Sequence, residues 1–479
     1  MMEIGMISAL NGDPTVVKRI QMKERMGIAM AVMQKKNISV DTQSSEYIPV
    51  RMLEVEIGQS LRTLSAVDEK RERTYKRARC LVRLHSQPLG IVELQFGTDK
   101  LSPGECATQI WHDLHTQINH HLIQDGLPQI KNLTAKGVLT PSTPFCTRER
   151  EQLLANAPFV SVIVPTHDRP DQLTACLNSL LALHYPEYEI IVVDNAPNTN
   201  ATVKLLEGLT DAPHAVRYVR EDRQGPSWAR NCGIAIARGE ILAFTDDDVV
   251  VDSYWLAEMV KSFRGDGAVV CATGLVLPME LDTPAQILFE EVGGYNKGFE
   301  RRIFSFEGDQ AELPMHPYIA ERFGTGASMA LTAAFIRSVG GFDPALGRVG
   351  PVRCSQDIAV FFQVIAQGYK LVYEPASLIY HQHRRDYLGL CKQTYNHSVG
   401  YTAYLTKSLT ENPHLIFDFI KKVPFALFCT LRARSLNNAP PLPRYVQVIH
   451  RELLMQRRKG LLYGPLAYLR SRWEVRKLT

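Results

Sequence analysis

The chain has 479 residues, of which 45% are apolar and 22% are charged, an ordinary composition for a globular protein with room for more than one domain. No segment reaches the ~20 uncharged apolar residues of a transmembrane helix, and we expect no signal peptide at residues 1–9. The nine cysteines are scattered and form no Cys-x-x-Cys pair. We therefore expect core cysteines and a reducing, cytoplasmic setting.

The net charge of +4 is distributed unevenly along the chain. Residues 432–479 contain eleven Lys or Arg and only two Asp or Glu. Such a basic segment suggests an anionic partner surface, such as a membrane leaflet or nucleic acid. The alternative is a solvated, partly helical tail without a partner.

The first part of the chain predicts a lead, a small module and a linker. Residues 1–45 show no convincing period, so we expect a mobile or weakly helical lead. Residues 46–135 contain alternating and helical patterns, which predict a small α+β module. The Pro-rich stretch at residues 141–144 marks a linker, which we place at residues 136–157.

Within the module, residues 75–85 alternate between apolar and basic side chains, which is typical of a half-buried strand. We expect a turn at residues 87–90 and a returning strand at residues 91–96. A helix should begin after Ser102, because a capping residue, a proline in the first turn and Glu105 form a capping box.

The helix after Ser102 is rich in histidine. His112, His115, His120 and His121 all lie on it. His112 and His115 could share a face, but no third metal ligand is evident. We therefore expect a solvated polar face rather than a metal site.

After the linker, four apolar segments alternate with helical ones. The expected strands are residues 159–165, 188–193, 215–219 and 240–245, and the expected helices are residues 169–183, 226–238 and 252–263 and a helix from about residue 199. Strand–helix alternation with unbroken apolar strands indicates an α/β fold with a parallel sheet covered on both faces.

Polar side chains gather where these strands end. The first strand delivers Thr166, His167, Asp168 and Arg169, the second delivers Asp194 and Asn195, and the fourth delivers Asp246, Asp247 and Asp248. Ligands of such sheets bind beyond the carboxyl ends of the strands, so a binding cleft explains this placement. No Gly-x-Gly-x-x-Gly or P-loop sequence follows the first strand, which argues against a dinucleotide enzyme and a P-loop NTPase.

The three adjacent aspartates are the most informative group. Their like charges repel, and a divalent cation is the usual way to offset them. Asp246 and Asp248 point the same way on an extended chain, so both could face one ion. The alternative is a cluster that caps the helix beginning near Asp252.

Other polar residues each allow two interpretations. Asp194 could bind a base or a ribose hydroxyl, or cap a turn. Arg230 could meet a diphosphate or pair with a carboxylate at the sheet edge. Asp357 could be a general base or serve only the dipole of the helix that follows it. His381 and His383 could face one site and add an imidazole to the carboxylates.

The order and spacing of eight motifs carry a resemblance. These are Val-Pro-Thr-His-Asp-Arg at residues 164–169, Val-Val-Asp-Asn at 192–195, Gly-Pro-Ser-Trp-Ala-Arg-Asn at 225–231, Phe-Thr-Asp-Asp-Asp at 244–248, Gly-Thr-Gly-Ala at 324–327, Gly-Gly-Phe-Asp at 340–343, Gln356-Asp357 and His-Gln-His-Arg at 381–384. The segment resembles family 2 glycosyltransferases of the GT-A fold, in the bacterial subgroup that makes cell-surface polysaccharide.

The resemblance implies a GT-A domain at residues 158–386, with a Rossmann-like, mostly parallel sheet and flanking helices, followed by a helical, basic region at residues 387–479. It assigns Asp357 as the catalytic base. The implied nucleotide-sugar contacts are Pro165, Thr166, Asp168, Arg169, Asp194, Asn195, Arg230, Asn231, Asp246 and Asp247. The implied ligands of Mg²⁺ or Mn²⁺ are Asp246, Asp248 and His381. The implied acceptor-side residues are Gly326, Ala327 and Ser328.

The implied activity is inverting transfer of a sugar from a nucleotide-diphospho-sugar to an acceptor hydroxyl on a glycan or lipid-linked molecule, in polysaccharide or glycolipid synthesis. The chain departs from the family where Gln356 replaces a common Glu and Ser328 replaces a common Asn. Two alternatives are a metal-dependent nucleotidyltransferase and a non-catalytic glycan- or membrane-binding scaffold on the same fold.

The C-terminal region carries one further hypothesis. The apolar stretch at residues 415–431 and the basic tail after it could lie on the inner face of the cell membrane. The expected location is therefore cytoplasmic with peripheral membrane contact, and no nucleic-acid partner is expected.

Overall fold

The structure, a computed structural model, describes residues 48–208, 214–308, 315–424 and 444–478. The lead expected at residues 1–45 lies outside these ranges, and so does the last part of the apolar stretch at residues 415–431.

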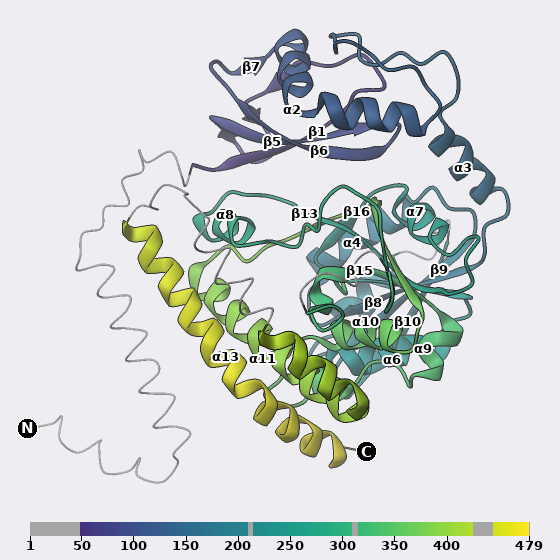
Figure 1. The fold of residues 1–479 in the computed structure, drawn as a ribbon, viewed down its shortest axis with the longest axis vertical. Helices are drawn as coiled ribbons and strands as arrows, with labels where there is room; N and C mark the ends of the chain where they lie inside the picture. The colour runs from purple at the N-terminus through teal and green to yellow at the C-terminus, as the bar shows by residue number, and fades with distance from the viewer. Residues whose placement is uncertain (1–47, 209–213, 309–314, 425–443, 479) are drawn as a thin grey trace, which may run out of the picture. The chain divides into compact units, whose positions relative to one another are not determined.

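A three-stranded sheet begins the described part of the chain, with strand order β1-β5-β6. Its elements are β1 (Val50–Glu56), β5 (Arg77–Leu84), β6 (Gln87–Gln95) and the helix α2 (Pro103–Gln124). β1 runs parallel to β5, and β5 and β6 form an antiparallel hairpin. The apolar stripe of α2 packs on the sheet and closes a separate core with it (Figure 1). Two short ladders accompany this sheet: β2 (Leu64–Ser65) with β7 (Lys100–Leu101), and β3 (Val67–Asp68) with β4 (Arg73–Thr74).

Two local predictions for this region have different outcomes. The capping box at Ser102 and Glu105 is confirmed in both directions. The turn expected at residues 87–90 is wrong, because the chain reverses at His85 and Ser86, which have φ values of 57° and 67°. A two-residue hairpin turn requires this left-handed backbone. Pro88 is tolerated in β6 because this strand lies at the sheet edge.

The expected linker at residues 136–157 contains a helix, α3 (Phe145–Leu154).

After it comes a nine-stranded sheet with the order β10-β9-β8-β11-β15-β13-β16-β12, in which β14 also pairs with β16. The strands are β8 (Val160–Thr166), β9 (Tyr188–Asn195), β10 (Ala215–Glu221), β11 (Ile241–Thr245), β12 (Val249–Val251), β13 (Val269–Pro278), β14 (Arg302–Phe304), β15 (Ser328–Thr332) and β16 (Lys370–His381). The first four in spatial order are parallel, and β15 is antiparallel to both of its neighbours. The predicted α/β fold class is confirmed.

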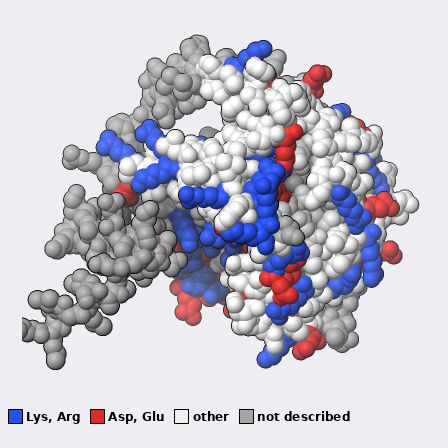
Figure 2. All heavy atoms as spheres, turned by 90° about the horizontal axis from the view of Figure 1, so that it is seen from below, with Lys and Arg blue, Asp and Glu red and all other residues white. Residues whose placement is uncertain are grey.

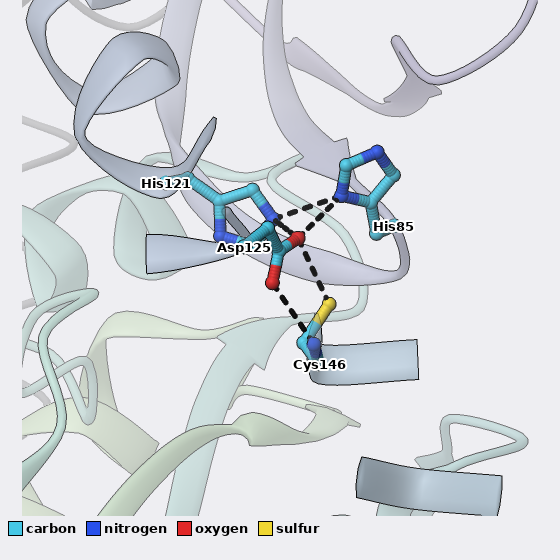
Figure 3. Close-up of side chains that lie close together, drawn as sticks. All are labelled: His85, His121, Asp125 and Cys146. Carbon is cyan, nitrogen blue, oxygen red and sulfur yellow. Dashed lines mark hydrogen bonds and ion pairs between the residues drawn. The ribbon is translucent and has the colours of Figure 1, made fainter. Parts of the chain in front are cut away.

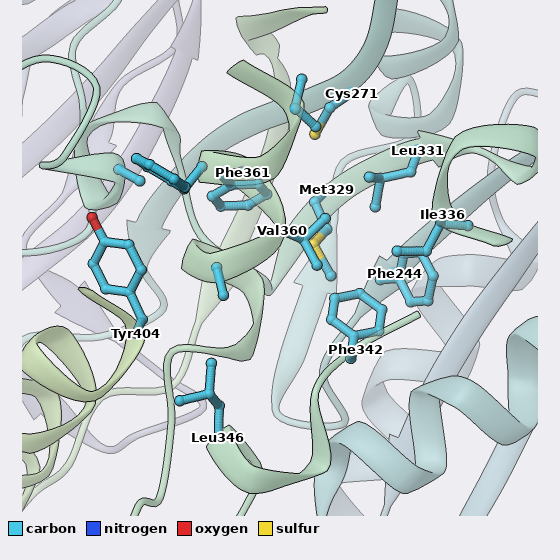
Figure 4. Close-up of a cluster of buried hydrophobic side chains, with 14 of the residues drawn as sticks. Phe244, Cys271, Met329, Leu331, Ile336, Phe342, Leu346, Val360, Phe361 and Tyr404 are labelled. Carbon is cyan, nitrogen blue, oxygen red and sulfur yellow. The ribbon is translucent and has the colours of Figure 1, made fainter. Parts of the chain in front are cut away.

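Helices cover both faces of the large sheet and create two cores. These helices are α4 (Pro170–Leu181), α5 (Ala201–Glu207), α6 (Pro226–Ile236), α7 (Trp255–Lys261), α8 (Pro284–Glu291), α9 (Ala333–Ser338) and α10 (Gln356–Ala366). One core joins the sheet to α4 and α7. The other joins it to α6, α9 and α10, with Phe244, Phe342 and Phe361 among its buried rings (Figure 4).

Two long helices end the chain, α11 (Tyr387–Glu411) and α13 (Arg444–Arg476) (Figure 1). They pack closely because α13 presents Gly460 and Gly464 to α11. A β-carbon at Gly464 would come within 1.9 Å of the Thr402 hydroxyl oxygen, and one at Gly460 would come within 2.6 Å of the Tyr395 carbonyl oxygen. Among the described residues, no helix has the length and apolar character needed to cross a membrane.

The three-stranded sheet contacts the large sheet through a buried arginine. Arg83 of β5 is 5% exposed, and its Nη1 atom lies 2.6 Å from Asp252 Oδ2 and 2.8 Å from Glu54 Oε1. Leu81 of the same strand packs with Leu275 and Leu378 of the large sheet.

Candidate active site

A cavity of about 1420 Å³ lies at the carboxyl ends of the parallel strands. Its lining includes Pro165 and Thr166 at the end of β8, Asn195 at the end of β9, and the three aspartates after β11. The opposite wall comes from α11 and α13, with Lys392, His397, Arg457 and Leu461 among its residues. The cleft expected at this sheet edge is therefore present, and it extends to the C-terminal helices.

Asp247 has a different environment from its two neighbours, since it is only 5% exposed. The Thr166 hydroxyl donates a hydrogen bond to its Oδ2 at 2.8 Å, and Arg169 Nη1 lies 3.2 Å from its Oδ1. Burial, followed by the negative charge of Asp248, raises the pKa of Asp247 to about 6. Through these two contacts Asp247 stabilises the segment that follows β11.

Asp246 and Asp248 lie near His381, as the i, i+2 spacing predicts. β12 pairs with β16 so that Val249 faces His381, and His381 Nε2 lies 3.4 Å from Asp248 Oδ1. One donor atom from each of the three residues falls within a mutual distance of 4.8 Å.

This trio fits a divalent cation. Two carboxylates and one imidazole are hard to borderline ligands of the kind that Mg²⁺ and Mn²⁺ accept. Burial lowers the pKa of His381, which favours the neutral imidazole that binds metals. The three donors leave several coordination positions open, as a site that also binds phosphate requires.

Arg230 connects the aspartates to the other side of the cavity. It projects from α6 and is 3% exposed. Its Nη2 donates to Asp246 Oδ1 at 2.9 Å and to the Gly326 carbonyl at 3.4 Å. Its buried Nε and Nη1 atoms have no hydrogen-bond partner among the described residues.

Asp357 lies in the first turn of α10, as the sequence predicts, and lines the cavity. Its Oδ2 accepts the Gly326 backbone N–H at 2.6 Å. A β-carbon at Gly326 would lie 2.7 Å from the same oxygen, so only glycine leaves room for the carboxylate here. Asp246, Arg230, Gly326 and Asp357 therefore form one continuous line of hydrogen bonds.

Four of the predicted site residues do not line the cavity, namely Asp168, Asp194, Asn231 and Ser328. Ser328 is buried in β15, where its hydroxyl accepts the Trp255 indole N–H at 3.0 Å, so it does not face an acceptor. The Asn231 side chain accepts the Phe342 backbone N–H and donates to the Phe342 carbonyl oxygen. In this structure it therefore fixes the loop that contains Phe342 and does not face the cavity.

Asp168 and Asp194 organise the neighbouring loops. Asp168 accepts the backbone N–H groups of Asn198 and Thr199 at 3.0 and 3.2 Å. Asp194 is fully buried, its Oδ2 accepts the Tyr218 hydroxyl at 3.3 Å, and burial raises its pKa. Neither carboxylate lines the cavity.

Sequence reasoning missed most of the cationic lining of the cavity. Lys297, Arg348, Arg353, Arg384, Lys392 and Arg457 all contribute to it. Arg384 stood in a motif that was considered for its histidines alone. Arg457 belongs to the basic segment at residues 432–479, the other four are isolated in the sequence, and only the fold brings them together.

Comparisons with known proteins agree with this geometry. Residues 161–323 match the family described as Glycosyl transferase family 2. This part of the chain is therefore similar to family 2 glycosyltransferases. The match begins in β8 and ends before Gly324, so it includes the three aspartates and Arg230.

Curated proteins are similar to this chain over part of their length. Glycosyltransferase AglE of Haloferax volcanii is 35% identical over 118 residues, which are 24% of this chain and 38% of that protein. O-antigen biosynthesis protein RfbC of Myxococcus xanthus is 31% identical over 242 residues, 47% of this chain and 17% of that protein. The chain thus matches less than half of the length of each.

Among solved structures, mannosyltransferase PcManGT from Pyrobaculum calidifontis, in complex with GDP-Man and Mn²⁺, is similar with a TM-score of 0.38 and 17% identity. The alignment covers 68% of this chain and 92% of that one.

Proposed function

We propose that the cavity transfers a sugar, with inversion, from a nucleotide-diphospho-sugar to an acceptor hydroxyl. The hydrogen-bonded line from Asp246 through Arg230 and Gly326 to Asp357 carries the proposal. It joins an acidic, cation-binding edge to a carboxylate that can accept a proton. Transfer of the sugar in a single displacement uses a cation to stabilise the leaving diphosphate and a carboxylate to accept the proton of the acceptor. It needs no nucleophilic side chain.

The donor would bind at the strand tips. Pro165, Thr166 and Asn195 line the side of the cavity where a nucleoside fits, and Arg169 closes it. The free Nε and Nη1 donors of Arg230 suit the oxygens of a diphosphate. Asp246, Asp248 and His381 would hold Mg²⁺ or Mn²⁺, and such an ion neutralises charge on the diphosphate.

Asp357 is the proposed general base. Its Oδ2 is oriented by the Gly326 N–H, so its Oδ1 is available to an acceptor hydroxyl. When that hydroxyl attacks the anomeric carbon from the face opposite the diphosphate, Asp357 takes its proton, and the configuration inverts. Gly326 and Ala327 would border the reacting sugar.

The acceptor would enter along α11 and α13, which form the wall opposite the strand tips. AglE and RfbC are named as a glycosyltransferase and an O-antigen biosynthesis protein, which supports a role in polysaccharide or glycolipid synthesis. A glycan or a lipid-linked sugar is accordingly the proposed acceptor.

The test is a screen of sugar nucleotides with Mg²⁺ or Mn²⁺, in which the released nucleotide is identified. We expect a nucleoside diphosphate and a product of inverted configuration. Asp357→Asn should lower the rate about 10²- to 10⁴-fold while nucleotide binding, measured by calorimetry, is retained. Release of pyrophosphate would support the nucleotidyltransferase instead, and full turnover by Asp357→Asn would remove the base assignment.

We also propose that α13 rests on an anionic membrane surface. One face of α13 is buried against α11, and the opposite face exposes an apolar stripe at helical spacing. The stripe consists of Met455, Leu462, Leu466, Leu469 and Trp473, of which Leu462 is 85% exposed. Exposed basic residues flank the stripe, namely Arg458, Lys459, Arg470, Arg472, Arg476 and Lys477.

An amphipathic helix with basic flanks binds anionic leaflets by apolar insertion and charge attraction together. Lys and Arg cover more of the face seen in Figure 2 than Asp and Glu do. Because α13 also lines the cavity, a membrane on its outer face would bring a lipid-linked acceptor close to Asp357.

Flotation with vesicles containing anionic lipid tests this surface. The double variant Leu462→Glu/Leu469→Glu should lose flotation, whereas Ile123→Glu, at a 55% exposed position of α2, should float like the parent. Equal flotation of all three proteins would reject the proposal. A dimer that only the double variant loses would assign the stripe to a second copy of the chain.

A further inference from the structure

Four metal-binding side chains converge at a second place, remote in sequence from the aspartates. His85 lies in the β5–β6 turn, His121 lies in the last turn of α2, Asp125 follows α2, and Cys146 lies in the first turn of α3. Figure 3 shows the four side chains pointing toward one another. One donor atom from each falls within a mutual distance of 4.8 Å.

Asp125 is the centre of this cluster. Its Oδ2 lies 2.7 Å from His85 Nδ1, 3.1 Å from His121 Nε2 and 3.2 Å from Cys146 Sγ. The two imidazole nitrogens lie 3.2 Å apart. All four side chains are at least nine-tenths buried, so the cluster is closed to solvent, unlike the cavity at the strand tips.

We propose that His85, His121, Asp125 and Cys146 form a structural zinc site. Two imidazoles, one carboxylate and one thiolate are the ligand types that Zn²⁺ accepts in a closed tetrahedral site. A thiolate and two imidazoles disfavour Mg²⁺ and Ca²⁺, which prefer oxygen. The His121 and Asp125 pair has the i, i+4 spacing that places two ligands on one helix face.

The donor separations agree with this proposal after a small adjustment. Ligands 2.0–2.3 Å from a tetrahedral zinc lie roughly 3.3–3.7 Å apart, so the 2.7 Å contact must open by roughly 0.6 Å and the contacts of 3.1 and 3.2 Å by less. The ion would replace the hydrogen bonds among the four side chains. The Cys146 thiol would lose its proton to solvent as the zinc–sulfur bond forms.

The backbone around the cluster is fixed independently of any ion. The Cys146 N–H donates to Asp125 Oδ1 at 2.9 Å, which leaves Oδ2 for coordination. The Glu56 carboxylate accepts the N–H groups of His85 and Ser86 at 3.1 and 2.9 Å and holds the turn. The ligands are therefore already positioned, which lowers the ordering cost of binding.

Such an ion would connect the small module to the catalytic sheet. Cys146 belongs to α3, and Arg150, one turn further along α3, makes a buried ion pair with Glu258 of α7 at 2.9 Å. Arg150 also lies over the Tyr254 ring at 4.0 Å. The zinc would thus fix α3 at one end while Arg150 fixes it in the middle.

The experiment uses the full chain without a histidine tag. Metal analysis after gel filtration should give about one zinc per chain, and the metal-free chain titrated with Co²⁺ should develop the near-ultraviolet thiolate band and the visible bands of a tetrahedral site. Neither readout depends on transfer activity. The thiolate band also separates this site from Asp246, Asp248 and His381, which contain no sulfur.

Matched variants assign the ligands. Cys146→Ser should abolish the thiolate band, and His121→Ala should weaken Co²⁺ binding at least about 100-fold. Cys391→Ser and His112→Ala, with His112 80% exposed on the same helix, should behave like the parent. A parent chain that retains no zinc and gives no thiolate band with Co²⁺ would overturn the proposal and leave a hydrogen-bonded cluster, and this result needs no variant to fold.

Discussion

The two proposed metal sites of this chain differ in the chemistry, burial and number of their donor groups. The strand-tip trio consists of two carboxylates and one imidazole, is partly buried, and opens on a large cavity. The module cluster has four donors, namely two imidazoles, one carboxylate and one thiol, and it is buried. An ion held by the open trio would keep coordination positions for a substrate, whereas an ion in the closed cluster would keep none. We therefore propose a catalytic role for the first site and a structural role for the second.

The comparison also shows how charge is balanced in each place. Two arginines, Arg169 and Arg230, approach the strand-tip aspartates, so that site tolerates loss and gain of an anionic ligand. In the module, hydrogen bonds from His121 and His85 hold the pKa of Asp125 well below its usual range.

The largest effect that would sharpen this contrast is expected from Asp248→Asn. Removing one donor of the open trio should lower transfer at least about 100-fold, while thermal unfolding shifts little, because the site is not part of either core. Rate assays with labelled donor and melting curves measure the two effects. Asp222→Asn, at a side chain that is 77% exposed, is the control, and a large loss of stability in Asp248→Asn would break the contrast.

Gly326→Ala is expected to have the second-largest effect on the transfer rate. The new β-carbon would lie 2.7 Å from Asp357 Oδ2, so the carboxylate must move. A displacement of about 1 Å in a catalytic group costs roughly 100-fold in rate. Steady-state kinetics should show the loss in kcat, and Gly267→Ala, where no atom lies within 4 Å of the new carbon, should be neutral. Unchanged kcat would mean that Asp357 is not positioned by Gly326.

His121→Ala should lower the stability of the chain and leave the transfer rate nearly unchanged, the reverse of what is expected for Asp248→Asn. It removes one partner of the buried Asp125 carboxylate and should destabilise the chain by about 2 kcal/mol, measured by urea unfolding in the presence of EDTA. Transfer by the folded protein should stay within about twofold of the parent, because the cluster lies outside the cavity lining. His112→Ala serves as the control. A rate loss without destabilisation would place this cluster in the reaction.

Arg83→Met should give an effect of about 2 kcal/mol or less, since one partner, Asp252, is buried and the other, Glu54, is 40% exposed. The neighbouring exposed pair Arg79–Glu93 offers a matched change, Arg79→Met, for which under about 0.5 kcal/mol is expected. Both are measured by denaturant unfolding. Equal effects would show that Arg83 does not link the module to the large sheet.

The residues at the strand ends could be predicted from the sequence, because each strand is recognised from a short apolar run and its end follows directly from that run. Apolar runs define parallel strands, and the residues after each run must meet at one edge. Thr166, Asn195, Asp246 and Asp248 therefore reach one cavity. Ser328 could not be placed this way, because the side of β15 that it occupies depends on pairing with β11.

The module cluster could not be predicted for a different reason. His85 lies in a turn that was expected two residues later, and Cys146 lies in a helix where a linker was expected. Contacts between such distant positions follow from tertiary packing, which leaves no periodic signal. The cationic residues Arg348 and Arg353 escaped prediction in the same way.

The glycines of α13 have a consequence for how this protein can diversify. Because Gly460 and Gly464 let α13 lie flush against α11, the last helix of the chain becomes a wall of the cavity. Under the proposed function, the residues that choose an acceptor and those that handle the donor are then encoded in separate stretches of sequence. Exchange of the final segment between relatives would alter what is glycosylated without altering how.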